Sequence, residues 1–526
     1  MENQKYGIGK QDFEAMIERG FVYVDKTPFI IKLLEGPDAC SLSRPRRFGK
    51  SLFISTLEHF FLGHRHLFKG LAIDSYEWDW EEYPVIRIDF SNGSFSRPDG
   101  LVERLDEIIN EIEIRYKVNT AKGSPRARLN SLITNLKEKY NKKVVILVDE
   151  YEKPLLDNIG RPEQLNAYRD ELADFYSVFK NKDTDIRFLF LTGITRFGHL
   201  NIFSGLNNLA DISLETRYDA ICGITEYELR RYFTPGINNY ANKNDISFEK
   251  ALQELKEYYD GYHFSVSLKD IYNPFSLLSC LNQEQLLPVW IGTGMTSSLF
   301  YLIKNRDWDL TKIENIKADA LSLMGIDAEF LAPVTLFYQT GYLTIKSFDR
   351  ESALYTLGIP NMEVRKALYN AIIPFYLGKG NELRENGISD LSIYIKEGRA
   401  KEMMEWFQTF FSKVPYETKL RLREDKPNAE RDFQFVVYAI FSLVCNFNRL
   451  HLEYSTAAGR SDIVIDSENF VYVIELKMGS TPKKALEQIE KSGYAVPWQS
   501  SGKKVIKIGA AFSSRSKGLL SFAISE

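Results

Sequence analysis

A glycine, a lysine and a serine follow one another at Gly49-Lys50-Ser51, after a short apolar run that ends at Arg44 and before a stretch with helical apolar spacing. Strand, glycine-lysine-serine and helix is the order that a phosphate-binding loop requires. The glycine lets the backbone approach phosphate oxygens, Lys50 reaches the β- and γ-phosphates, and the Ser51 hydroxyl ligates Mg²⁺. These residues therefore predict a site for a nucleoside triphosphate, ATP, with Mg²⁺ beside it.

The loop departs from the usual pattern at its start. Arg44 stands where the first glycine is expected, and Pro45 has no N–H to offer a phosphate. A basic surface turn is therefore the alternative to a nucleotide site. In that case Arg44, Arg46 and Arg47 contact nucleic-acid phosphates or remain solvated.

Acidic residues farther along the chain support the nucleotide interpretation. The continuous apolar run 144–148 is typical of a strand covered on both faces, and it ends in Asp149-Glu150. At the carboxyl edge of a parallel sheet, Asp149 can hold the Mg²⁺ water shell and Glu150 can polarise the attacking water. Thr192 and Arg196 follow the next strand and are candidates for sensing the γ-phosphate, with a solvated strand-end turn as the alternative.

Three of these segments together resemble the AAA-ATPase-like proteins that are abundant in gut anaerobes: residues 43–52, 148–151 and 191–196. Residues 23–27, 259–262 and 272–276 extend the resemblance, which covers about residues 5 to 280. The arginine-proline replacement belongs to the pattern of that family. The resemblance implies an NTP-binding P-loop domain. The cofactor-binding residues expected there are Arg47, Phe48, Gly49, Lys50, Ser51, Asp149, Thr192 and Arg196.

A second group of residues lies near the C-terminus. Residues 461–466 and 470–477 have the pattern of two strands joined by the turn 467–469. Such a hairpin puts Asp462 across from Ile474 or Glu475, and Glu475 and Lys477 share one face because they are two apart. In such a group the two carboxylates can hold Mg²⁺, and the ammonium can orient a water molecule. This arrangement suits phosphodiester hydrolysis. A surface hairpin with a Glu475–Lys477 salt bridge is the alternative.

Asp462, Glu475 and Lys477 stand at the motif positions of the PD-(D/E)XK nuclease superfamily, which this segment resembles. The resemblance implies a restriction-endonuclease-like α/β fold and DNA or RNA as the partner. It places Glu430, at the start of a helix, where an additional acidic metal ligand often stands. The helix 484–491 matches the subfamily that follows such ATPase domains, and Gln488 and Tyr494 would lie near the site there.

The elements that must position these residues divide the chain into three parts. Strand and helix patterns alternate in the first third, which predicts a parallel α/β sheet. Helical patterns dominate from Thr225 to Leu383. Two helical stretches and a β-rich tail follow. The predicted organisation is a P-loop domain over residues 1–215, a mostly helical middle region over 216–386, and a nuclease-like α/β domain over 387–526.

Composition fits an ordinary globular protein of 526 residues. The 67 basic and 71 acidic residues exclude a wholly basic coat for nucleic acid, so any such contact uses local patches. The four cysteines form no CxxC pair, the start of the chain is polar, and the longest apolar stretch, 435–447, is too short for a membrane span. A cytoplasmic protein without a membrane partner is expected. A homo-oligomer is possible, since many P-loop ATPases work as rings or dimers.

Together these patterns predict an ATP-binding P-loop ATPase coupled to a Mg²⁺-dependent nuclease that processes nucleic acid. Its catalytic residues are Glu150, Asp462, Glu475 and Lys477, and its metal ligands are Ser51, Asp149, Glu430, Asp462 and Glu475. The alternative is a nucleotide-switched module that binds nucleic acid or protein and carries an inactive nuclease fold. The altered phosphate loop favours this alternative, and the intact Asp462, Glu475 and Lys477 set favours the enzyme.

Overall fold

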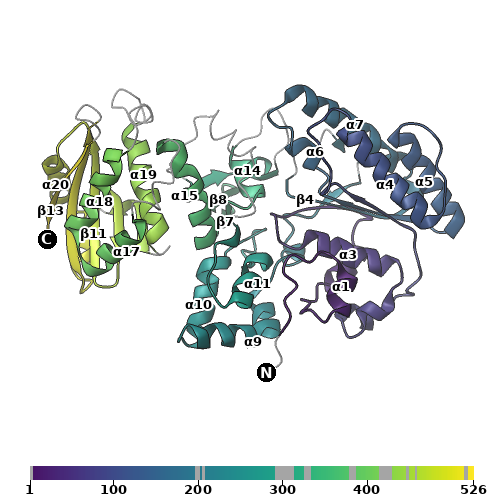
Figure 1. The fold of residues 1–526 in the computed structure, drawn as a ribbon, viewed down its shortest axis with the longest axis horizontal. Helices are drawn as coiled ribbons and strands as arrows, with labels where there is room; N and C mark the ends of the chain where they lie inside the picture. The colour runs from purple at the N-terminus through teal and green to yellow at the C-terminus, as the bar shows by residue number, and fades with distance from the viewer. Residues whose placement is uncertain are drawn as a thin grey trace. The chain divides into compact units, whose positions relative to one another are not determined.

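A computed structural model gives the structure of the chain (Figure 1). It describes residues 4–195, 202–203, 206, 208–290, 313–324, 333–377, 387–413, 429–445, 449–456, 459–513 and 519–526. The chain forms two compact units. The first comprises Met1–Trp308 and Glu314–Pro360, and the second comprises Asp309–Ile313 and Asn361–Glu526. The three-part division expected from the sequence stays a prediction, because the main boundary between the two units lies at Pro360.

The first unit is built on a five-stranded sheet in the order β2-β3-β4-β1-β5, and each neighbouring pair is parallel. Its strands are β1 (Ala39–Ser43), β2 (Val85–Asp89), β3 (Val144–Asp149), β4 (Ile186–Gly193) and β5 (Ala210–Asp211). β3 is buried along its whole length, as its uninterrupted apolar run predicts. Because β4 lies between β1 and β3, the carboxyl ends of these three strands are neighbours.

Helices cover both faces of this sheet (Figure 1). On one side lie α1 (Phe13–Glu18) and α3 (Lys50–Phe61), and on the other α4 (Gly100–Tyr116), α5 (Pro125–Tyr140), α6 (Lys153–Leu156) and α7 (Pro162–Asn181). The short α2 (Pro28–Leu34) precedes β1. Two covered faces explain why the central strands read as continuous apolar runs. The predicted parallel α/β fold of this part is confirmed.

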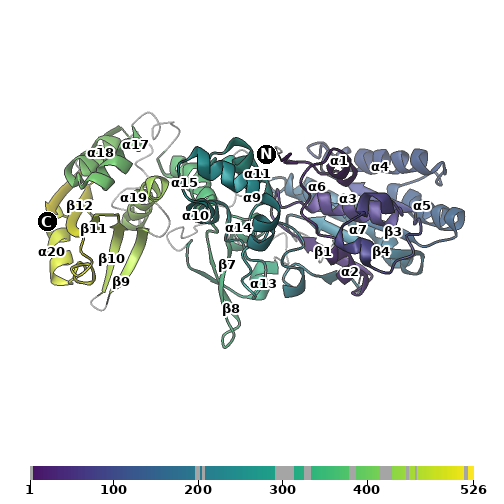
Figure 2. The ribbon, with the colours of Figure 1, turned by 90° about the horizontal axis from the view of Figure 1, so that it is seen from below.

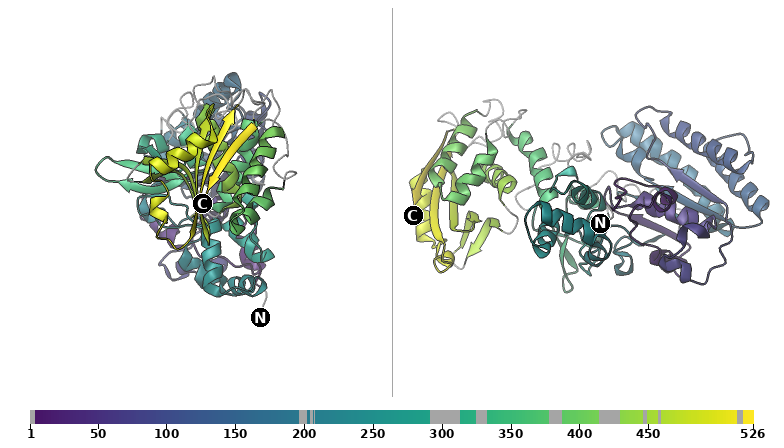
Figure 3. Two further views of the ribbon diagram at one scale, coloured as in Figure 1. Left: turned by 90° about the vertical axis from the view of Figure 1, so that its left-hand side faces the viewer. Right: turned by 60° about the horizontal axis from the view of Figure 1, so that its bottom comes forward.

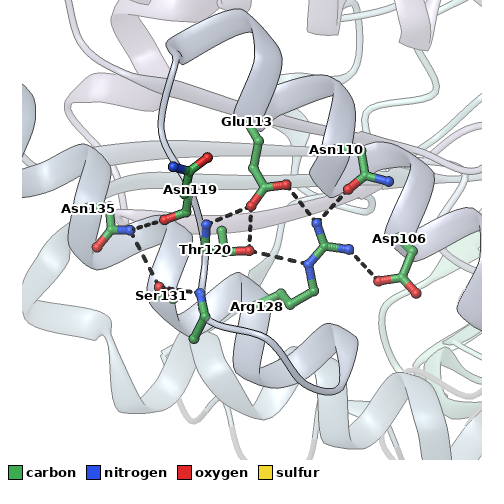
Figure 4. A network of polar contacts seen from close by, with 9 residues as sticks. Asp106, Asn110, Glu113, Asn119, Thr120, Arg128, Ser131 and Asn135 are labelled. Atoms are coloured by element: carbon green, nitrogen blue, oxygen red, sulfur yellow. Dashed lines mark hydrogen bonds and ion pairs between the residues drawn. The ribbon is translucent and has the colours of Figure 1, made fainter.

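A polar network fixes α5 against α4 (Figure 4). The Arg128 guanidinium donates to Asp106 Oδ1 at 2.6 Å, Asn110 Oδ1 at 2.6 Å and Glu113 Oε2 at 2.8 Å. Glu113 in turn accepts from the backbone N–H of Thr120 in the connection between the two helices. Because Glu113 accepts from both Arg128 and Thr120, the network holds the turn between α4 and α5 in place.

The remainder of the first unit is mostly helical, as predicted. It contains α9 (Glu226–Lys243), α10 (Phe248–Tyr259), α11 (Pro274–Gln283), α13 (Ala320–Met324) and α14 (Pro333–Gln339). The sequence pattern did not predict a small antiparallel sheet of β6 (Ile316–Ala318), β7 (Thr344–Asp349) and β8 (Leu354–Gly358). Figure 2 shows the β7–β8 hairpin standing out beside these helices.

The second unit is a mixed sheet in the order β13-β12-β11-β10-β9, with β11 and β12 parallel and the other pairs antiparallel. Its strands are β9 (Leu450–Thr456), β10 (Gly459–Asp466), β11 (Phe470–Met478), β12 (Lys504–Ser513) and β13 (Leu519–Ser525). Its helices are α15 (Met362–Leu377), α17 (Ile388–Glu397), α18 (Ala400–Lys413), α19 (Ala429–Val444) and α20 (Pro482–Lys491). β9 and β13 were not predicted; the other strands and the helix α20 were.

Alternate residues of β11 show that helices cover both faces of this sheet too. Val471 and Val473 pack with Ile489 of α20. Tyr472 points the opposite way and donates its hydroxyl hydrogen to the backbone oxygen of Ile395 in α17 at 2.8 Å. Figure 3 shows the sheet with these helices around it. The apolar stretch 435–447 falls largely within α19, and no helix among the described residues is long and apolar enough to cross a membrane.

Candidate functional sites

The phosphate-loop residues lie between the end of β1 and the start of α3. Gly49 caps α3 with φ 94°, a left-handed conformation that favours glycine. A side-chain carbon at Gly49 would meet no atom within 4 Å, so backbone conformation rather than space requires the glycine. Lys50 and Ser51 open α3, so the N–H groups of its first turn are available to an anion. The predicted strand-loop-helix context is present.

The Lys50 ammonium lies inside its own loop. Its Nζ donates to the backbone oxygens of Arg44 at 2.9 Å and Pro45 at 3.1 Å, and the side chain is nearly buried. Lys50 also lines the cavity described below. A phosphate that reached Nζ would compete with these two carbonyl contacts.

Arg44 is neither solvated nor exposed to a nucleic acid, so both roles considered for it from sequence are wrong. It is 1% exposed and donates to the backbone oxygens of Ser213 at 2.8 Å and Tyr218 at 3.1 Å. Its guanidinium also lies 4.2 Å from the centre of the Phe264 ring. Arg44 thus anchors the start of the loop to the chain beyond β5. A glycine at this position could not make these contacts, which require a long donor side chain.

Phe48 and Arg47 occupy different environments. The Phe48 ring is buried at centroid distances of 4.8 Å from Tyr262 and 5.3 Å from Phe264. The Arg47 guanidinium lies 4.6 Å from the Phe275 ring at the rim of the cavity. Both residues line the cavity, but the Phe48 side chain mainly holds the loop in place.

The acidic residues after β3 lie at the same sheet edge. Asp149 is 1% exposed, and its Oδ1 accepts from the Thr192 hydroxyl at 2.7 Å. Its buried Oδ2 accepts no hydrogen bond from any described residue. Burial raises the pKa of Glu150, while the Lys50 ammonium opposes this rise. Asp149, Glu150 and Thr192 therefore lie at one sheet edge, and Arg196 lies outside the described residues.

Glu152 is a buried residue beside the site whose role the sequence did not indicate. It is fully buried, and its Oε1 accepts from the backbone N–H of Ile194 at 2.5 Å and of Thr195 at 3.3 Å. Burial raises its pKa to about 7. A side-chain carbon at Gly193 would lie only 2.1 Å from Glu152 Oε2, so any larger residue here would displace the Glu152 side chain. Glu152 ties the turn after β3 to the turn after β4.

A cavity of about 510 Å³ opens beside the phosphate loop within the first unit. Gly49, Lys50, Ser51 and Glu150 are among the residues that line it. This volume lies within the range of ligand pockets in proteins, about 300–1,000 Å³. The cavity gives the loop a place where a nucleotide can lie.

The strand register of the C-terminal hairpin shows which residue stands opposite Asp462. The register pairs Ile463 with Ile474, so Asp462 stands opposite Glu475. Asp462 Oδ2 accepts from the backbone N–H of Leu476 at 2.7 Å. Lys477 Nζ lies 3.1 Å from Glu475 Oε1. The two carboxylates and the ammonium converge at one end of the hairpin, as predicted.

This cluster is electrostatically unusual because the buried carboxylate of Glu475 lies beside the half-buried carboxylate of Asp462. Burial, and then the charge of Glu475, raise the pKa of Asp462 to about 7. Burial also raises the pKa of Glu475, against the effect of Lys477. Burial alone would lower the pKa of Lys477, but its contact with Glu475 raises it overall. Neighbouring groups with displaced pKa values in one place are a feature of functional sites.

Glu430, at the start of α19, reaches the same place. Its Oε2 accepts from the backbone N–H of Met478 at 3.0 Å, and its Oε1 lies 3.8 Å from Lys477 Nζ. Tyr494 is buried near the start of β10, where a side-chain carbon at Gly459 would lie 3.1 Å from its hydroxyl oxygen. Gln488 is half-buried on α20.

The donor set of the hairpin suits a divalent cation. Glu475 is 1% exposed, and its Oε2 accepts no hydrogen bond from the described part of the chain. Adjacent carboxylate oxygens are the ligands that Mg²⁺ prefers. No group of three or more His, Cys, Asp or Glu in the described ranges is arranged to hold a metal ion. A cation here would therefore rest on Asp462 and Glu475 and complete its shell with water or backbone oxygen.

The fold and the two sites define the class of protein. A parallel sheet with a phosphate loop after β1 and carboxylates after β3 is typical of P-loop ATPases, and the carboxylate hairpin is typical of PD-(D/E)XK nucleases. Comparison with known families agrees. Residues 7–203 match the family described as predicted AAA-ATPase, and residues 428–520 match the PD-(D/E)XK nuclease superfamily.

A relative in Azotobacter chroococcum mcd 1 is similar along the whole chain. It is described as an uncharacterized protein in the vnfD 5' region, and it is 33% identical over 534 aligned residues, which cover 100% of this chain and 99% of the relative. The chain therefore belongs to the family of AAA-ATPase-like proteins that carry a C-terminal PD-(D/E)XK nuclease superfamily domain.

Proposed function

We propose that this protein binds ATP in its first unit and cleaves phosphodiester bonds of nucleic acid in its second unit, with Mg²⁺ at the hairpin. The observation that carries the proposal is the convergence of Asp462, Glu475 and Lys477 at one end of the hairpin. A salt bridge on a surface hairpin, the alternative, would not need two carboxylates, one of them 1% exposed, next to each other.

Each residue of the hairpin has a chemical role in this proposal. Asp462 and Glu475 would hold Mg²⁺, with Glu430 as a further acidic neighbour. A bound divalent cation lowers the pKa of its water and neutralises charge at the reacting phosphate. Lys477 keeps its proton because carboxylates surround it, so it can orient the attacking water or face the developing negative charge.

In the first unit, Lys50 would exchange its contacts with the loop carbonyls for phosphate oxygens. Ser51 and Asp149 would hold Mg²⁺, and the Thr192 hydroxyl fixes the orientation of the Asp149 carboxylate. Glu150 would polarise the attacking water. The raised pKa of Glu150 supports this role, because a base is most effective when its pKa lies nearer neutral pH.

A second function has a specific observation in its favour. Lys50 is held by two backbone oxygens, and Arg44 and Phe48 fasten the loop to residues 213–264. A loop fastened in this way suits a switch that binds ATP without rapid turnover. In that case the protein would hold nucleic acid or a protein partner, and the hairpin would be inactive.

The experiment that separates the two functions is incubation of the purified full chain with end-labelled DNA and RNA. Each substrate is tested in single- and double-stranded form, with and without Mg²⁺ and with and without ATP. Cleavage that requires Mg²⁺ supports the nuclease. Retention of nucleic acid without cleavage under every metal condition supports the binding module.

Three further expectations belong to this proposal. The nucleic acid contacts a local basic patch rather than a basic coat, since the net charge is −4. The protein works in the cytoplasm, and it assembles as a homo-oligomer if its ATPase part acts as in ring or dimer ATPases. The three parts 1–215, 216–386 and 387–526 act as ATPase, connecting region and nuclease.

A further inference from the structure

The backbone at Glu150 has a conformation that residues with side chains rarely adopt. Its φ is 53°, in the left-handed region that favours glycine. Glu150 follows β3 directly, and its backbone oxygen accepts from the N–H of Lys153, the first residue of α6. Its side chain lines the cavity beside the phosphate loop. A strained conformation persists only where neighbouring contacts hold it, so the residues on either side of Glu150 must supply those contacts.

Tyr151 supplies the first of these contacts. It is 1% exposed, and its hydroxyl donates to the backbone oxygen of Thr195 at 2.9 Å. Its backbone N–H donates to the backbone oxygen of Thr192 at 3.4 Å. The Tyr151 ring also packs against the Phe203 ring, with 5.3 Å between the ring centroids. The residue that follows Glu150 is therefore bound to the end of β4 and to the turn after it.

Glu152 binds the same turn with the opposite hydrogen-bond polarity. Its Oε1 accepts from the backbone N–H groups of Ile194 and Thr195, whereas Tyr151 donates to the turn. Both side chains lie directly against Gly193, because a side-chain carbon there would be 2.1 Å from Glu152 Oε2 and 2.9 Å from Tyr151 Cε1. These contacts of Tyr151 and Glu152 form a turn clasp around Gly193.

The residue before Glu150 is fixed as well. Asp149 stands opposite Thr192 in the pairing of β3 with β4, and its Oδ1 accepts from the Thr192 hydroxyl at 2.7 Å. Asp149 on one side and the turn clasp on the other therefore attach Glu150 to a single short segment, residues 192–195. A carboxylate that serves as a base must lie within hydrogen-bond reach of the water that it activates. Fixing the backbone on both sides limits the positions that this carboxylate can reach.

We propose that Tyr151 and Glu152 are positioning residues for ATP hydrolysis: the turn clasp holds Glu150 in its left-handed conformation, so that its carboxylate meets the attacking water. The water gives its proton to Glu150 as its oxygen bonds to the γ-phosphorus, the bond from that phosphorus to the β,γ-bridging oxygen breaks, and ADP leaves. The inference rests on the proposed ATPase function and names the contacts that control its base. Because Thr192 is the candidate sensor of the γ-phosphate, the clasp also makes the position of the base depend on the segment that senses the phosphate.

The test measures turnover and nucleotide affinity separately on the full chain with Mg²⁺. Phosphate release gives kcat, and calorimetry with the β,γ-imido analogue of ATP gives Kd. Glu152→Leu removes the acceptor of two N–H groups and should lower kcat about thirtyfold to a hundredfold, since a small displacement of a reacting group causes a loss of this size. Its Kd should stay within about twofold of wild type, because the phosphate loop is unchanged and the lost interaction matters only in the transition state.

Conservative variants separate positioning from a merely structural role. Glu152→Gln keeps an oxygen for the same N–H groups and should restore kcat to within about threefold of wild type. Tyr151→Phe keeps the ring, loses the hydrogen bond to Thr195, and should lower kcat about tenfold at unchanged Kd. Tyr116→Phe is the matched control: the hydroxyl of this buried residue donates to the backbone oxygen of Val85 in β2 at 3.1 Å, and its loss should change neither quantity.

Wild-type kcat in both Glu152→Leu and Tyr151→Phe, or a kcat as low in Glu152→Gln as in Glu152→Leu, overturns the inference alone. Weaker binding of the analogue in step with the lower kcat also overturns it, because both residues would then be structural. If Glu152→Leu does not fold, Tyr151→Phe decides: a selective loss of kcat supports the inference, and wild-type kcat overturns it. A wild type that releases no phosphate, whether or not it binds the analogue, overturns the proposed hydrolysis and the inference with it.

Discussion

The buried carboxyl of Glu152 makes the stability of the first unit depend on pH in a calculable way. Its pKa is about 7 in the folded protein, against an ordinary value of 4.5. Below pH 4.5 the carboxyl is protonated in both the folded and the unfolded chain, and folding is not penalised. Between pH 4.5 and 7 the unfolded chain has released a proton that the folded chain keeps, so the free energy of unfolding falls as pH rises. Above pH 7 the loss is complete.

The size of this effect follows from the two pKa values. At 1.36 kcal/mol for each pH unit, the gap corresponds to about 3 kcal/mol at alkaline pH, of which about 2.5 kcal/mol develops between pH 5 and pH 8. Glu152→Gln keeps an oxygen for the N–H groups of Ile194 and Thr195 and cannot ionise. Relative to wild type, the variant should therefore gain about 2.5 kcal/mol of stability when the pH rises from 5 to 8.

Urea unfolding at the two pH values measures this difference. Pulsed hydrogen exchange of peptides from β3 and β4 reports on the first unit separately, because a chain of two units does not unfold in one step. Any pH-independent loss of stability caused by the amide cancels, because the comparison uses only the change in unfolding free energy between pH 5 and pH 8. Glu138→Gln, at an exposed position of α5, is the control and should show no such change. A difference between Glu152→Gln and wild type that is the same at both pH values would refute the reasoning.

Other substitutions give separate expectations. Lys50→Ala should weaken ATP binding about tenfold to a hundredfold by calorimetry, because charge-assisted contacts to the phosphates are lost, and unchanged affinity would exclude this loop as the site. Glu150→Gln should keep ATP affinity and slow phosphate release, and an unaffected rate would remove Glu150 as the base. Lys477→Ala should slow nucleic-acid cleavage about a hundredfold while Mn²⁺ affinity at the hairpin persists, and loss of metal binding instead would argue for a structural role. Arg128→Ala should lower the free energy of unfolding by about 2–4 kcal/mol, since three acceptors lose their donor, with ATP affinity unchanged; normal stability would contradict the network in Figure 4.

The parts of the sites that are local in sequence could be predicted from it. Gly49, Lys50 and Ser51 are consecutive, and their role depends only on a strand before and a helix after them. Asp462 and Glu475 lie in one hairpin, so alternation along two short strands is enough to bring them together. The length of the turn left the register open by one residue, and the observed pairing of Ile463 with Ile474 resolves it.

The parts that depend on distant contacts could not be predicted in this way. Arg44 has the appearance of a surface residue in sequence, and its burial depends on Ser213 and Phe264, far along the chain. The role of Glu152 depends on its hydrogen bond with the backbone N–H of Ile194, in the turn after β4. Gly193 leaves room for the Glu152 side chain, but the two residues are 41 positions apart, and only the fold shows that they are neighbours. The burial of the Lys26 ammonium depends on its ion pair with Glu228 of α9, about 200 residues away in sequence.

In the proposed function, Glu475 serves a metal-dependent cleavage reaction at the hairpin. The most direct measurement compares wild type, Glu475→Gln and Glu468→Gln for cleavage of labelled DNA and RNA with Mg²⁺ and ATP present. Glu468 is exposed on the turn of the same hairpin, so its variant is the matched control. Wild type and Glu468→Gln should cleave alike, and Glu475→Gln should be at least about a hundredfold slower, because a metal ligand is lost. Equal cleavage by Glu475→Gln would contradict the assignment, and a wild type that cleaves neither substrate with any divalent metal would leave the binding module in its place.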